Sequence, residues 1–324
     1  MPHASRVTEH ESPFASAQGK RVTDLRSALR DAIAQLEREH VPSAALAAEL
    51  LLMHVLGKDR AWLYAHPEAA LDSAASEQYF ALVARRASGV PTQYLTGHQE
   101  FWGLDFEVTP AVLIPRPETE HVIEVALERL GASATSNSPR PDAPFLIADV
   151  GTGSGCIAVA LAHELPAARI VATEISPAAL EVARRNAARH AVASRIDFIE
   201  CNLLDVLLHE SRVTNHDSRP FDVIVSNPPY IGRQEAASLP REVRGHEPEV
   251  ALFAGETGVE FYAPLIAQSA SLLKPGGALV VELGHNSADH VLRLLHSPHW
   301  TDAAITNDLA GIPRVASARC ATSA

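Results

Sequence analysis

The sequence is poor in cysteine and has no long run of apolar residues. Three cysteines stand among its 324 residues, at positions 156, 201 and 320, and so small an odd number cannot build the disulfide framework of a secreted domain. Their sparsity is typical of a reducing compartment, and we expect a cytoplasmic protein. No stretch approaches the roughly 20 consecutive apolar residues that a transmembrane helix needs, so no membrane association is expected.

Positive charge is also scarce. The 27 Lys and Arg residues face 39 Asp and Glu residues, which gives a net charge of −12, and the lysines are Lys20, Lys58 and Lys274. A protein that holds long nucleic acid by its phosphates normally has a basic surface. We therefore expect no direct binding of long nucleic acid, although the 24 arginines could still form a local basic patch.

Patterns of metal ligands are missing as well. The 16 histidines include none in a CxxC…HxxxH arrangement, which is the spacing typical of a zinc site. His296 and His299 are three residues apart, but Pro298 would break any helix that aligned them. No metal is expected.

The first 90 residues have a helical pattern. The apolar positions of the first helix form one stripe of Leu25, Leu29, Ile33 and Leu36. Ser43 and Gly57 are placed to begin and end a second helix, and a third is expected over residues 73–86. The segment shows no strand pattern and no cluster of catalytic residue types. We predict a disordered leader at 1–20, without the apolar core of a signal peptide, and a helical packing or docking domain at 21–90.

The pattern changes after the helical segment. Residues 91–114 are rich in aromatic and β-branched side chains and are interrupted by Gly103 and Pro110. This composition predicts a β-hairpin that links two domains. Pro117 then stands where proline is favoured, at the first turn of a helix, with Glu120 close behind it near the positive end of the helix dipole.

From Phe145 onward, strand and helix patterns alternate. Strands are expected over 145–150, 169–173, 196–200, 221–226 and 278–282, and helices over 156–164, 177–190 and 258–273. Such alternation builds a mainly parallel sheet with helices on both faces. We therefore predict an α/β domain over 115–324. The polar segment 207–220 has no periodicity and is expected to be a surface excursion.

A glycine-rich turn, DVGTGSG at 149–155, joins the first of these strands to a helix. Glycines let the main chain turn sharply and present N–H groups to a ligand at the helix N-terminus. The spacing differs from the dinucleotide fingerprint GxGxxG, and there is no GxxxxGK[ST] phosphate loop. Glu174 ends the next strand, where doubly wound folds place a carboxylate on ribose hydroxyls. Together the two features predict a nucleoside-bearing cofactor.

A second motif, NPPY at 227–230, directly follows the strand 221–226, at the edge where open α/β sheets bind ligands. The Asn227 side-chain oxygen and the Pro228 carbonyl can accept both hydrogens of an –NH₂ group, and Tyr230 can cover a planar group by stacking. A proline-rich turn capped by asparagine is the structural alternative. It would not explain why the turn coincides with a nucleoside site.

With these motifs the chain resembles an S-adenosylmethionine-dependent methyltransferase of planar amino groups, and most closely the bacterial release factor glutamine methyltransferases (the HemK or PrmC family). The matching segments lie between about 22 and 319 and are RRASGVPTQYLTG (85–97), EFWGL (100–104), LIPRPETE (113–120), EPEVALFAGETG (247–258), KPGG (274–277) and DLAGIPR (308–314). The resemblance implies a Rossmann-like methyltransferase domain with an N-terminal helical bundle and a connecting β-hairpin.

The resemblance also implies which residues hold S-adenosylmethionine. They are Gly151, Thr152, Gly153, Ser154 and Gly155 around its methionine part, Glu174 at the ribose, Asn202 and Leu203 at the adenine, and Asn227 at the junction with the substrate. Three positions depart from the family pattern. Glu174 stands where aspartate is usual, the segment containing Asn202 replaces an acidic-aromatic pair, and Asn286 stands where the family usually has glutamine.

The implied substrate is the glutamine of the Gly-Gly-Gln motif in class I peptide chain release factors. Asn227, Pro228, Pro229 and Tyr230 would hold its amide with Phe101 beside it, and the catalytic residues would be Asn227, Pro228 and Tyr230. Because an amide nitrogen has no useful basicity, catalysis would rest on orienting that nitrogen toward the sulfonium methyl group. The helical domain would dock the release factor.

Two other functions stay open at this stage. A nucleic acid amino-methyltransferase would use the same tetrapeptide on an exocyclic amine, but it would need a flipped base and phosphate contacts, which the net charge of −12 disfavours. A binding module with a relict cofactor site would bind the cofactor without turnover. The intact segments 151–155 and 227–230 disfavour this second alternative.

Overall fold

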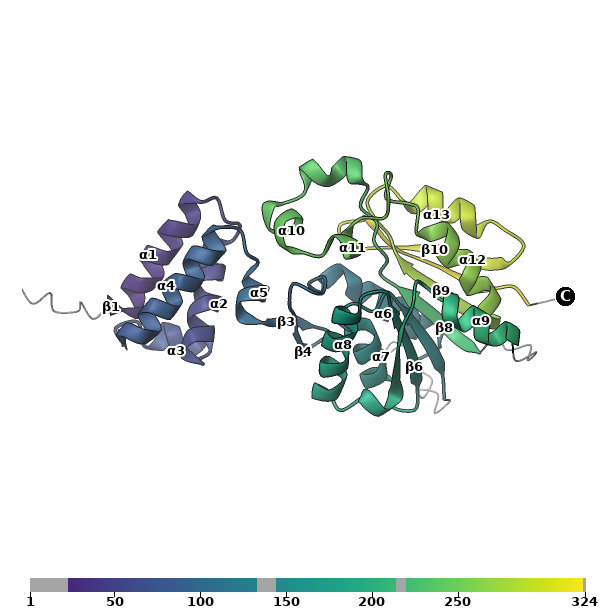
Figure 1. Ribbon diagram of the computed structural model, residues 1–324, viewed down its shortest axis with the longest axis horizontal. Coiled ribbons are helices and arrows are strands. Elements are labelled where there is room, and N and C mark those ends of the chain that lie inside the picture. The colour runs from purple at the N-terminus through teal and green to yellow at the C-terminus, as the bar shows by residue number, and fades with distance from the viewer. Residues whose placement is uncertain (1–22, 133–143, 214–219, 323–324) are drawn as a thin grey trace, which may run out of the picture. The chain divides into compact units, whose positions relative to one another are not determined.

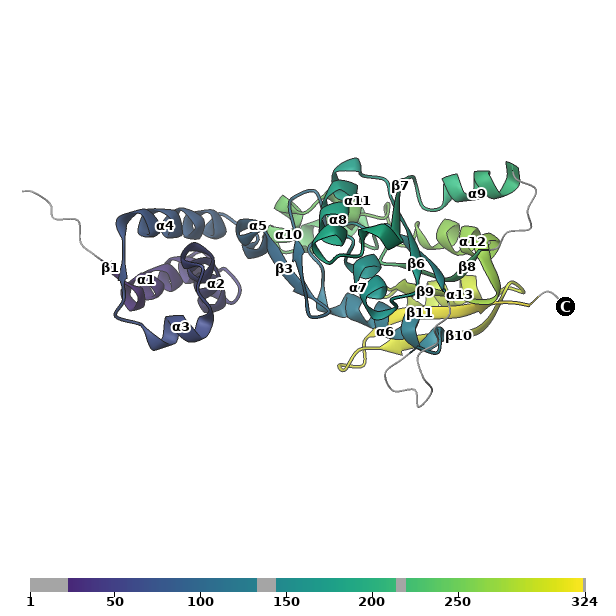
Figure 2. The same ribbon diagram turned by 90° about the horizontal axis from the view of Figure 1, so that it is seen from below.

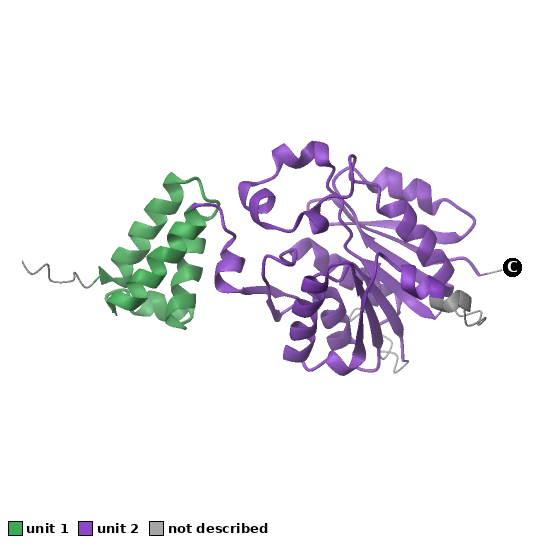
Figure 3. Ribbon diagram, in the orientation of Figure 1, with its two compact units in different colours: residues 1–87 green, residues 88–324 purple. Residues whose placement is uncertain are grey.

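The computed structural model describes residues 23–132, 144–213 and 220–322. The chain divides into two compact units, residues 1–87 and residues 88–324 (Figure 3). The expected leader at 1–20, and most of the loop that precedes the first strand of the large sheet, lie outside the described residues.

The first unit packs its helices around a core of small and branched apolar side chains. Its elements are β1 (Thr23–Asp24), α1 (Leu25–Arg38), α2 (Ala44–Leu56), α3 (Arg60–Ala65), β2 (Ala70–Leu71) and α4 (Ser73–Ala87). The fully buried side of α1 consists of Leu25, Ala28, Ala32 and Leu36. Leu29 and Ile33, expected on the same stripe, are only partly buried and line a groove beside Leu63. Alanines take their place because α1 packs against both α2 and α4.

Two expectations for this unit are wrong in detail. β1 and β2 form an antiparallel pair with Thr23 opposite Leu71, and a pair of two residues is too short to leave a periodic signal in the sequence. Ser43 precedes α2 with φ of 52° and its side chain makes no capping hydrogen bond. Gly57 does end the helix as expected, in the left-handed conformation with φ of 61°.

The second unit begins with α5 (Thr92–Thr96), β3 (His98–Phe101) and β4 (Leu104–Glu107). The hairpin formed by β3 and β4 is thus shorter than the 91–114 expected, because Pro91 starts a helical turn that Gly97 ends with φ of 80°. The Tyr94 hydroxyl donates to the Val112 carbonyl at 2.6 Å. This bond ties α5 to the loop that follows the hairpin.

The large sheet has seven strands in the order β10-β11-β9-β8-β5-β6-β7. The strands are β5 (Leu146–Val150), β6 (Arg169–Glu174), β7 (Ile196–Glu200), β8 (Phe221–Ser226), β9 (Leu273–Glu282), β10 (Trp300–Asn307) and β11 (Pro313–Cys320). The five strands β5 to β9 are parallel, whereas β11 runs antiparallel to both β9 and β10. The parallel strands were expected, and the antiparallel pair at the edge was not.

Helices cover both faces of the sheet, as Figures 1 and 2 show. They include η1 (Pro117–Thr119), α6 (Glu120–Arg129), α7 (Cys156–Glu164), α8 (Pro177–Arg189), η2 (Ala193–Arg195), α12 (Tyr262–Leu272) and α13 (Ala288–Leu295). Alternate residues of one strand enter two different cores. Val223 and Val225 pack with α6 and α7, whereas Ile224 packs with α12 and α13. This is the layered α/β fold that the alternating pattern predicts.

The segments after β7 and β8 complete the second unit. They form α9 (Asp205–Val213), η3 (Arg233–Ser238), α10 (Arg241–His246) and α11 (Glu249–Leu252). The expected surface excursion at 207–220 is wrong over its first half, which belongs to α9. Leu207 and Leu208 pack against the core on the α12 face, so an apolar contact holds this stretch in a helix. No helix of the described residues combines the length and apolarity needed to cross a membrane.

Candidate functional site

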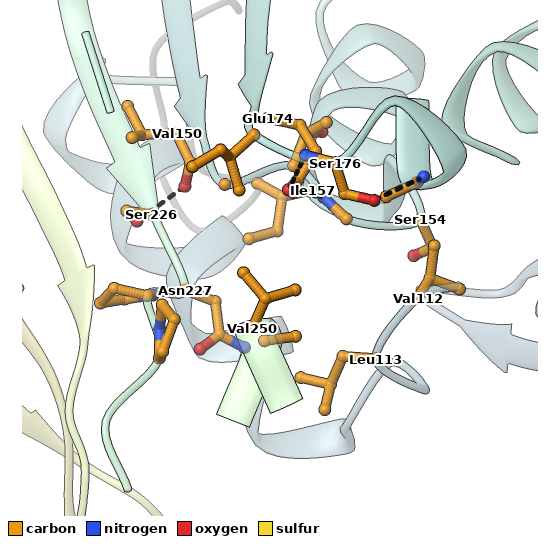
Figure 4. A pocket seen from close by; sticks show the side chains of 18 of the residues that line it. Val112, Leu113, Val150, Ser154, Ile157, Glu174, Ser176, Ser226, Asn227 and Val250 are labelled. Atoms are coloured by element: carbon orange, nitrogen blue, oxygen red, sulfur yellow. Dashed lines mark hydrogen bonds between the residues drawn. The ribbon is translucent and has the colours of Figure 1, made fainter. Parts of the chain in front are cut away.

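The loops at the carboxyl ends of β5, β6 and β8 meet around one cavity. β5 and β8 are neighbours, and the chain runs outward from them in opposite directions, so the order of the sheet reverses between these two strands. Open α/β sheets bind their ligands in the crevice at such a point. Figure 4 shows side chains from several elements around this space, with Glu174 and Ser154 on one side and Asn227 on another.

The glycine-rich turn opens its main chain onto the cavity. Gly151 and Gly153 have φ of 72° and 54°, and nothing lies within 4 Å of the position that a Cβ would take on either. Gly155 differs from them, because a Cβ there would approach Ala183 to 3.1 Å. Gly155 therefore lets α7 pack against α8, and it does not line the cavity as its place in the motif led us to expect.

A buried carboxylate under the turn holds it in shape. Asp149 Oδ2 accepts from the Thr152 hydroxyl at 2.6 Å and from the Ala158 amide at 3.1 Å. The Asp149 side chain is fully buried, and this burial raises its pKa to about 7. Asp149 thus joins the turn to the first residues of the helix that follows it.

Glu174, at the end of β6, lies directly beside the turn. Its Oε2 accepts from the Gly153 amide and its Oε1 from the Ser176 amide, both at 3.0 Å. Each carboxylate oxygen has a second lone pair. The two main-chain bonds thus fix the carboxylate in place while it can still accept hydrogen bonds from a pair of ligand hydroxyls.

Asn202 and Leu203 form the wall after β7. Leu203 has a left-handed φ of 48°, and the Asn202 amide donates to the Asp205 carboxylate at 3.3 Å. Ile175 lies between this wall and the turn and is half exposed. These side chains give the cavity a largely apolar slot in which a flat ring could lie.

The NPPY segment leaves the sheet on the opposite side of the cavity. Asn227 directly follows β8, and its Nδ2 donates to the Thr119 hydroxyl at 3.0 Å. Oδ1 is then the amide atom that can accept a hydrogen bond from a ligand. Pro228 and Pro229 also line the cavity.

Besides Gly155, two further predicted site residues do not line the cavity. The Tyr230 ring packs against Gly284, and its hydroxyl donates to the Glu282 carboxylate at 3.2 Å, so Tyr230 anchors the segment from behind. Phe101 is 1% exposed and packs edge-on against Phe106 with ring centroids 6.1 Å apart. It points into the core because it lies on the inner side of the β3–β4 hairpin.

The sequence motifs did not indicate the loop residues that complete the wall of the cavity. They come from two distant segments and include Val112, Leu113, Pro115, Val250, Ala251 and Phe261. Arg116 and Glu247 join these segments with a hydrogen-bonded ion pair of 2.5 Å. Both residues lie in segments that resemble the family, LIPRPETE and EPEVALFAGETG, but neither spacing indicated that the two would meet.

Glu247 is a structural carboxylate. It is 5% exposed, and burial raises its pKa although Arg116 acts in the opposite direction. Glu249, two residues on, is instead exposed and lies 3.8 Å from Arg233. The two glutamates therefore do not form an acid/base pair. Cys156 lines the cavity as a thiol whose pKa is raised to about 12 by burial, which makes it a poor nucleophile.

The donor set fits S-adenosylmethionine. A fixed carboxylate, Glu174, suits a ribose diol, and the apolar slot beside it suits adenine. Among the described residues that line the cavity there is no lysine or arginine, and Glu174 is their one charged side chain. This charge suits a cationic sulfonium and not a phosphate-bearing nucleotide. In the described part of the chain, no group of three or more His, Cys, Asp and Glu residues is placed to bind a metal.

The sequence matches two family models. Residues 27–97 match the PrmC N-terminal domain and residues 141–241 match the methyltransferase small domain. Among solved structures, the hMettl16 catalytic domain is similar in fold, with a TM-score of 0.50 and 19% identity over 73% of this chain and 81% of that chain. At this identity the likeness concerns the fold alone.

Curated relatives match nearly the whole chain. The release factor glutamine methyltransferase of Koribacter versatilis is 44% identical over 299 residues, which are 92% of this chain and 99% of the relative. The proteins of the same name from Chlorobaculum tepidum and Bradyrhizobium diazoefficiens are 44% and 41% identical over 86% and 91% of this chain, and over 92% and 94% of their own length. The chain therefore belongs to the family of release factor glutamine methyltransferases.

Proposed function

We propose that this protein transfers a methyl group from S-adenosylmethionine to the side-chain amide nitrogen of the glutamine in the Gly-Gly-Gln motif of class I release factors. The observation that carries the proposal is the fixed amide of Asn227. It stands beside the Pro228 carbonyl, at the wall of the cavity that the glycine-rich turn and Glu174 also line. Two acceptors of this kind match the two hydrogens of a primary amide.

The proposed mechanism depends on orientation. S-adenosylmethionine, when bound, would supply a methyl group activated by its sulfonium charge. As the bond from nitrogen to the methyl carbon forms, the bond from sulfur to that carbon breaks and leaves a neutral thioether, and the amide nitrogen releases one proton to water. Asn227 and Pro228 hold the plane of the substrate amide so that its nitrogen faces that methyl group, and positioning of this kind can contribute about 7–11 kcal/mol to a bimolecular step. The apolar residues that complete the cavity wall, such as Leu113 and Val250, exclude water from the reacting atoms.

We further propose a division of labour between the two units. All described residues that line the cavity belong to residues 88–324, which leaves the helical domain at 21–90 free to dock the release factor. The hairpin region at 91–114 connects it to the catalytic domain at 115–324. A protein that modifies release factors acts where translation occurs, and we place it in the cytoplasm.

Mass mapping of the product tests the proposal. A class I release factor is incubated with the full chain and S-adenosylmethionine, digested, and compared with a release factor whose Gly-Gly-Gln glutamine is replaced by alanine. We expect one added methyl group, on that glutamine, and none on the alanine variant. A methyl group on another residue, or on RNA offered in the same mixture, would overturn the assignment.

A further inference from the structure

A buried carboxylate lies behind the NPPY segment, outside the cavity itself. Glu282 is the last residue of β9 and is 2% exposed. Val281 pairs with Ser226 of β8, so the residues that follow, Glu282 and Asn227, leave the two strands at the same level. A glutamate with so little exposure needs an explanation, because burying a carboxylate is costly unless donors surround it.

Two hydroxyls from the site influence this carboxylate. The Tyr230 hydroxyl donates to its Oε1 at 3.2 Å. The Thr119 hydroxyl acts on the same carboxylate and lowers the Glu282 pKa, as a hydrogen-bond donor does. Oε2 has no hydrogen-bond partner among the described residues, which leaves it as a free acceptor for the Thr119 proton. Glu282 therefore interacts with one residue of the NPPY segment directly and with another, Asn227, through Thr119.

The direction of this chain of hydrogen bonds determines which end of the Asn227 amide faces the cavity. A threonine hydroxyl has one proton, and if that proton is directed at Glu282, the oxygen meets Asn227 with a lone pair. Nδ2 of Asn227 then donates to the Thr119 oxygen, 3.0 Å away. If Glu282 were neutral, the Thr119 proton could turn toward Asn227, and the amide would flip and present N–H groups to the cavity.

We infer that Glu282 is a positioning residue whose negative charge sets the direction of the chain through Thr119, so that Asn227 offers Oδ1 to the amide that receives the methyl group. The identity of that amide rests on the proposed function. The direction of the chain does not, because it concerns atoms of this protein alone.

The surroundings of Glu282 make its charge depend on pH in the neutral range. Burial is the largest effect and raises its pKa to about 7. The titratable groups that face it are Glu118, Tyr230, Tyr262, Arg314 and Cys156. Glu118 raises the pKa of Glu282 further and Arg314 lowers it. Below about pH 7 the carboxylate gains a proton, and the direction of the chain is then no longer fixed.

Single-turnover methyl transfer at saturating cofactor tests the role in catalysis. We expect Thr119→Val and Glu282→Gln to lower the rate about 10- to 100-fold, which is the lower part of the range for one preorganised polar contact, with little change in the KM for the release factor. Thr119→Ser keeps the hydroxyl and should restore most of the rate. The parent rate should fall below pH 7, and this fall should be missing in Glu282→Gln.

Two control variants separate this role from loss of packing. Asp222→Asn removes a carboxylate at the other end of β8, where it pairs with Lys274, and Ser269→Ala removes a buried hydroxyl that bonds only within α12. Both should leave the rate and its pH profile unchanged. A rate for Thr119→Val equal to that of the parent would overturn the inference, as would a pH profile that Glu282→Gln leaves intact.

A measurement without substrate keeps the inference separate from the proposed function. Carboxyl ¹³C NMR of the full chain should show Glu282 titrating near pH 7, and Thr119→Val should move this titration to higher pH because a donor is lost. Thr119→Ser should return it to the parent value. If the parent enzyme methylates no glutamine, the proposed function fails, but this titration still reports on the interaction between Glu282 and Thr119. If Thr119→Val leaves the Glu282 titration unchanged, Thr119 does not interact with Glu282, and the inference is refuted.

Discussion

The guanidinium of Arg116 reaches the buried carboxylate of Glu247 at 2.5 Å, although 131 positions separate them in the sequence. Pro115, next to Arg116, and Val250, shortly after Glu247, both line the cavity. The ion pair therefore connects the two segments that complete the wall of the cavity. Because Glu247 is 5% exposed, the pair is shielded from water in a way that surface pairs are not.

Arg116→Ala should leave Glu247 buried without its cation. Removing one partner of a buried pair costs about 3–5 kcal/mol, so the melting temperature should fall and the cofactor should bind more weakly as the two segments separate. Thermal unfolding and calorimetry with S-adenosylmethionine measure the two effects. Arg233→Ala is the matched control, since its partner Glu249 is exposed and 3.8 Å away, and such pairs contribute about 0–1 kcal/mol. Equal effects of the two variants would contradict this account.

Glu174→Ala should weaken cofactor binding while the fold persists. A hydrogen bond to a charged group contributes about 1.5–3 kcal/mol, which corresponds to an affinity loss of about 10- to 150-fold. Glu200→Ala offers a close control, because Glu200 pairs with Glu174 at the end of the neighbouring strand but is exposed and outside the cavity lining. Calorimetry that finds the same affinity for both variants would show that the ribose is held elsewhere.

Glu282→Gln should stabilise the fold at high pH while it slows the reaction. The pKa of Glu282 in the folded protein is about 7, above its usual 4.5, so its contribution to stability is present below about pH 4.5 and is lost as the pH rises through 7. Between about pH 4.5 and 7 the free energy of unfolding of the variant should gain on that of the parent by up to about 1.4 kcal/mol per pH unit. Above pH 7 the carboxylate is ionised in both the folded and the unfolded chain, so the difference should stay constant.

Denaturant unfolding between about pH 5.5 and 9 measures this difference, which should grow up to about pH 7 and level off above it. Glu260→Gln serves as the control, because the pKa of Glu260 is lowered to about 2 by hydrogen bonds from main-chain amides. This group is ionised in both the folded and the unfolded chain over that range, so its difference from the parent should not change with pH. If the difference in free energy of unfolding between Glu282→Gln and the parent also does not change with pH, burial does not raise the pKa of Glu282.

Much of the fold could be predicted because the parallel strands are buried on both faces. Such strands appear in the sequence as short apolar runs, and the predicted bounds 221–226 are those of the buried strand β8. The edge strand β10 and its neighbour β11 are joined by a short turn without a helix, and β10 is largely exposed or half-buried. The mixture of polar and apolar residues in β10 therefore did not predict a strand.

The site could be predicted only in part, for a related reason. Motif residues at strand ends, such as Glu174 and Asn227, converge because all parallel strands end at one edge. Contacts between distant loops, such as Arg116 with Glu247, follow from the tertiary fold and leave no spacing to detect. Gly155 and Tyr230 belong to motifs, but their side of the main chain faces packing contacts and not the cavity.

Removal of residues 1–87 should separate cofactor binding from recognition of the release factor. The lining of the cavity lies within residues 88–324, so the truncated protein should bind S-adenosylmethionine with an affinity close to that of the full chain. It should methylate a short Gly-Gly-Gln peptide as the full chain does, but a whole release factor poorly. Comparison of kcat/KM for the two substrates measures this. Equal values on the whole release factor would refute the docking role.

Asn227→Ala should cause the largest loss of activity of these variants. Without Oδ1 the substrate amide loses the acceptor that holds its plane, and loss of one preorganised polar contact at a reacting centre typically lowers the rate about 10²- to 10³-fold. Cofactor affinity should fall less, because Glu174 and the glycine-rich turn lie at the ends of other strands.

Asn227→Asp examines the acceptor role more closely. Aspartate retains the shape and an oxygen acceptor, but it loses the N–H that donates to Thr119 and adds a charge beside the sulfonium. If acceptance is the role of Asn227, the aspartate variant should keep more activity than the alanine variant in single-turnover methyl transfer at saturating cofactor. An alanine variant within a few-fold of the parent rate would instead make NPPY a structural turn, and the proposed orientation of the amide would fail with it.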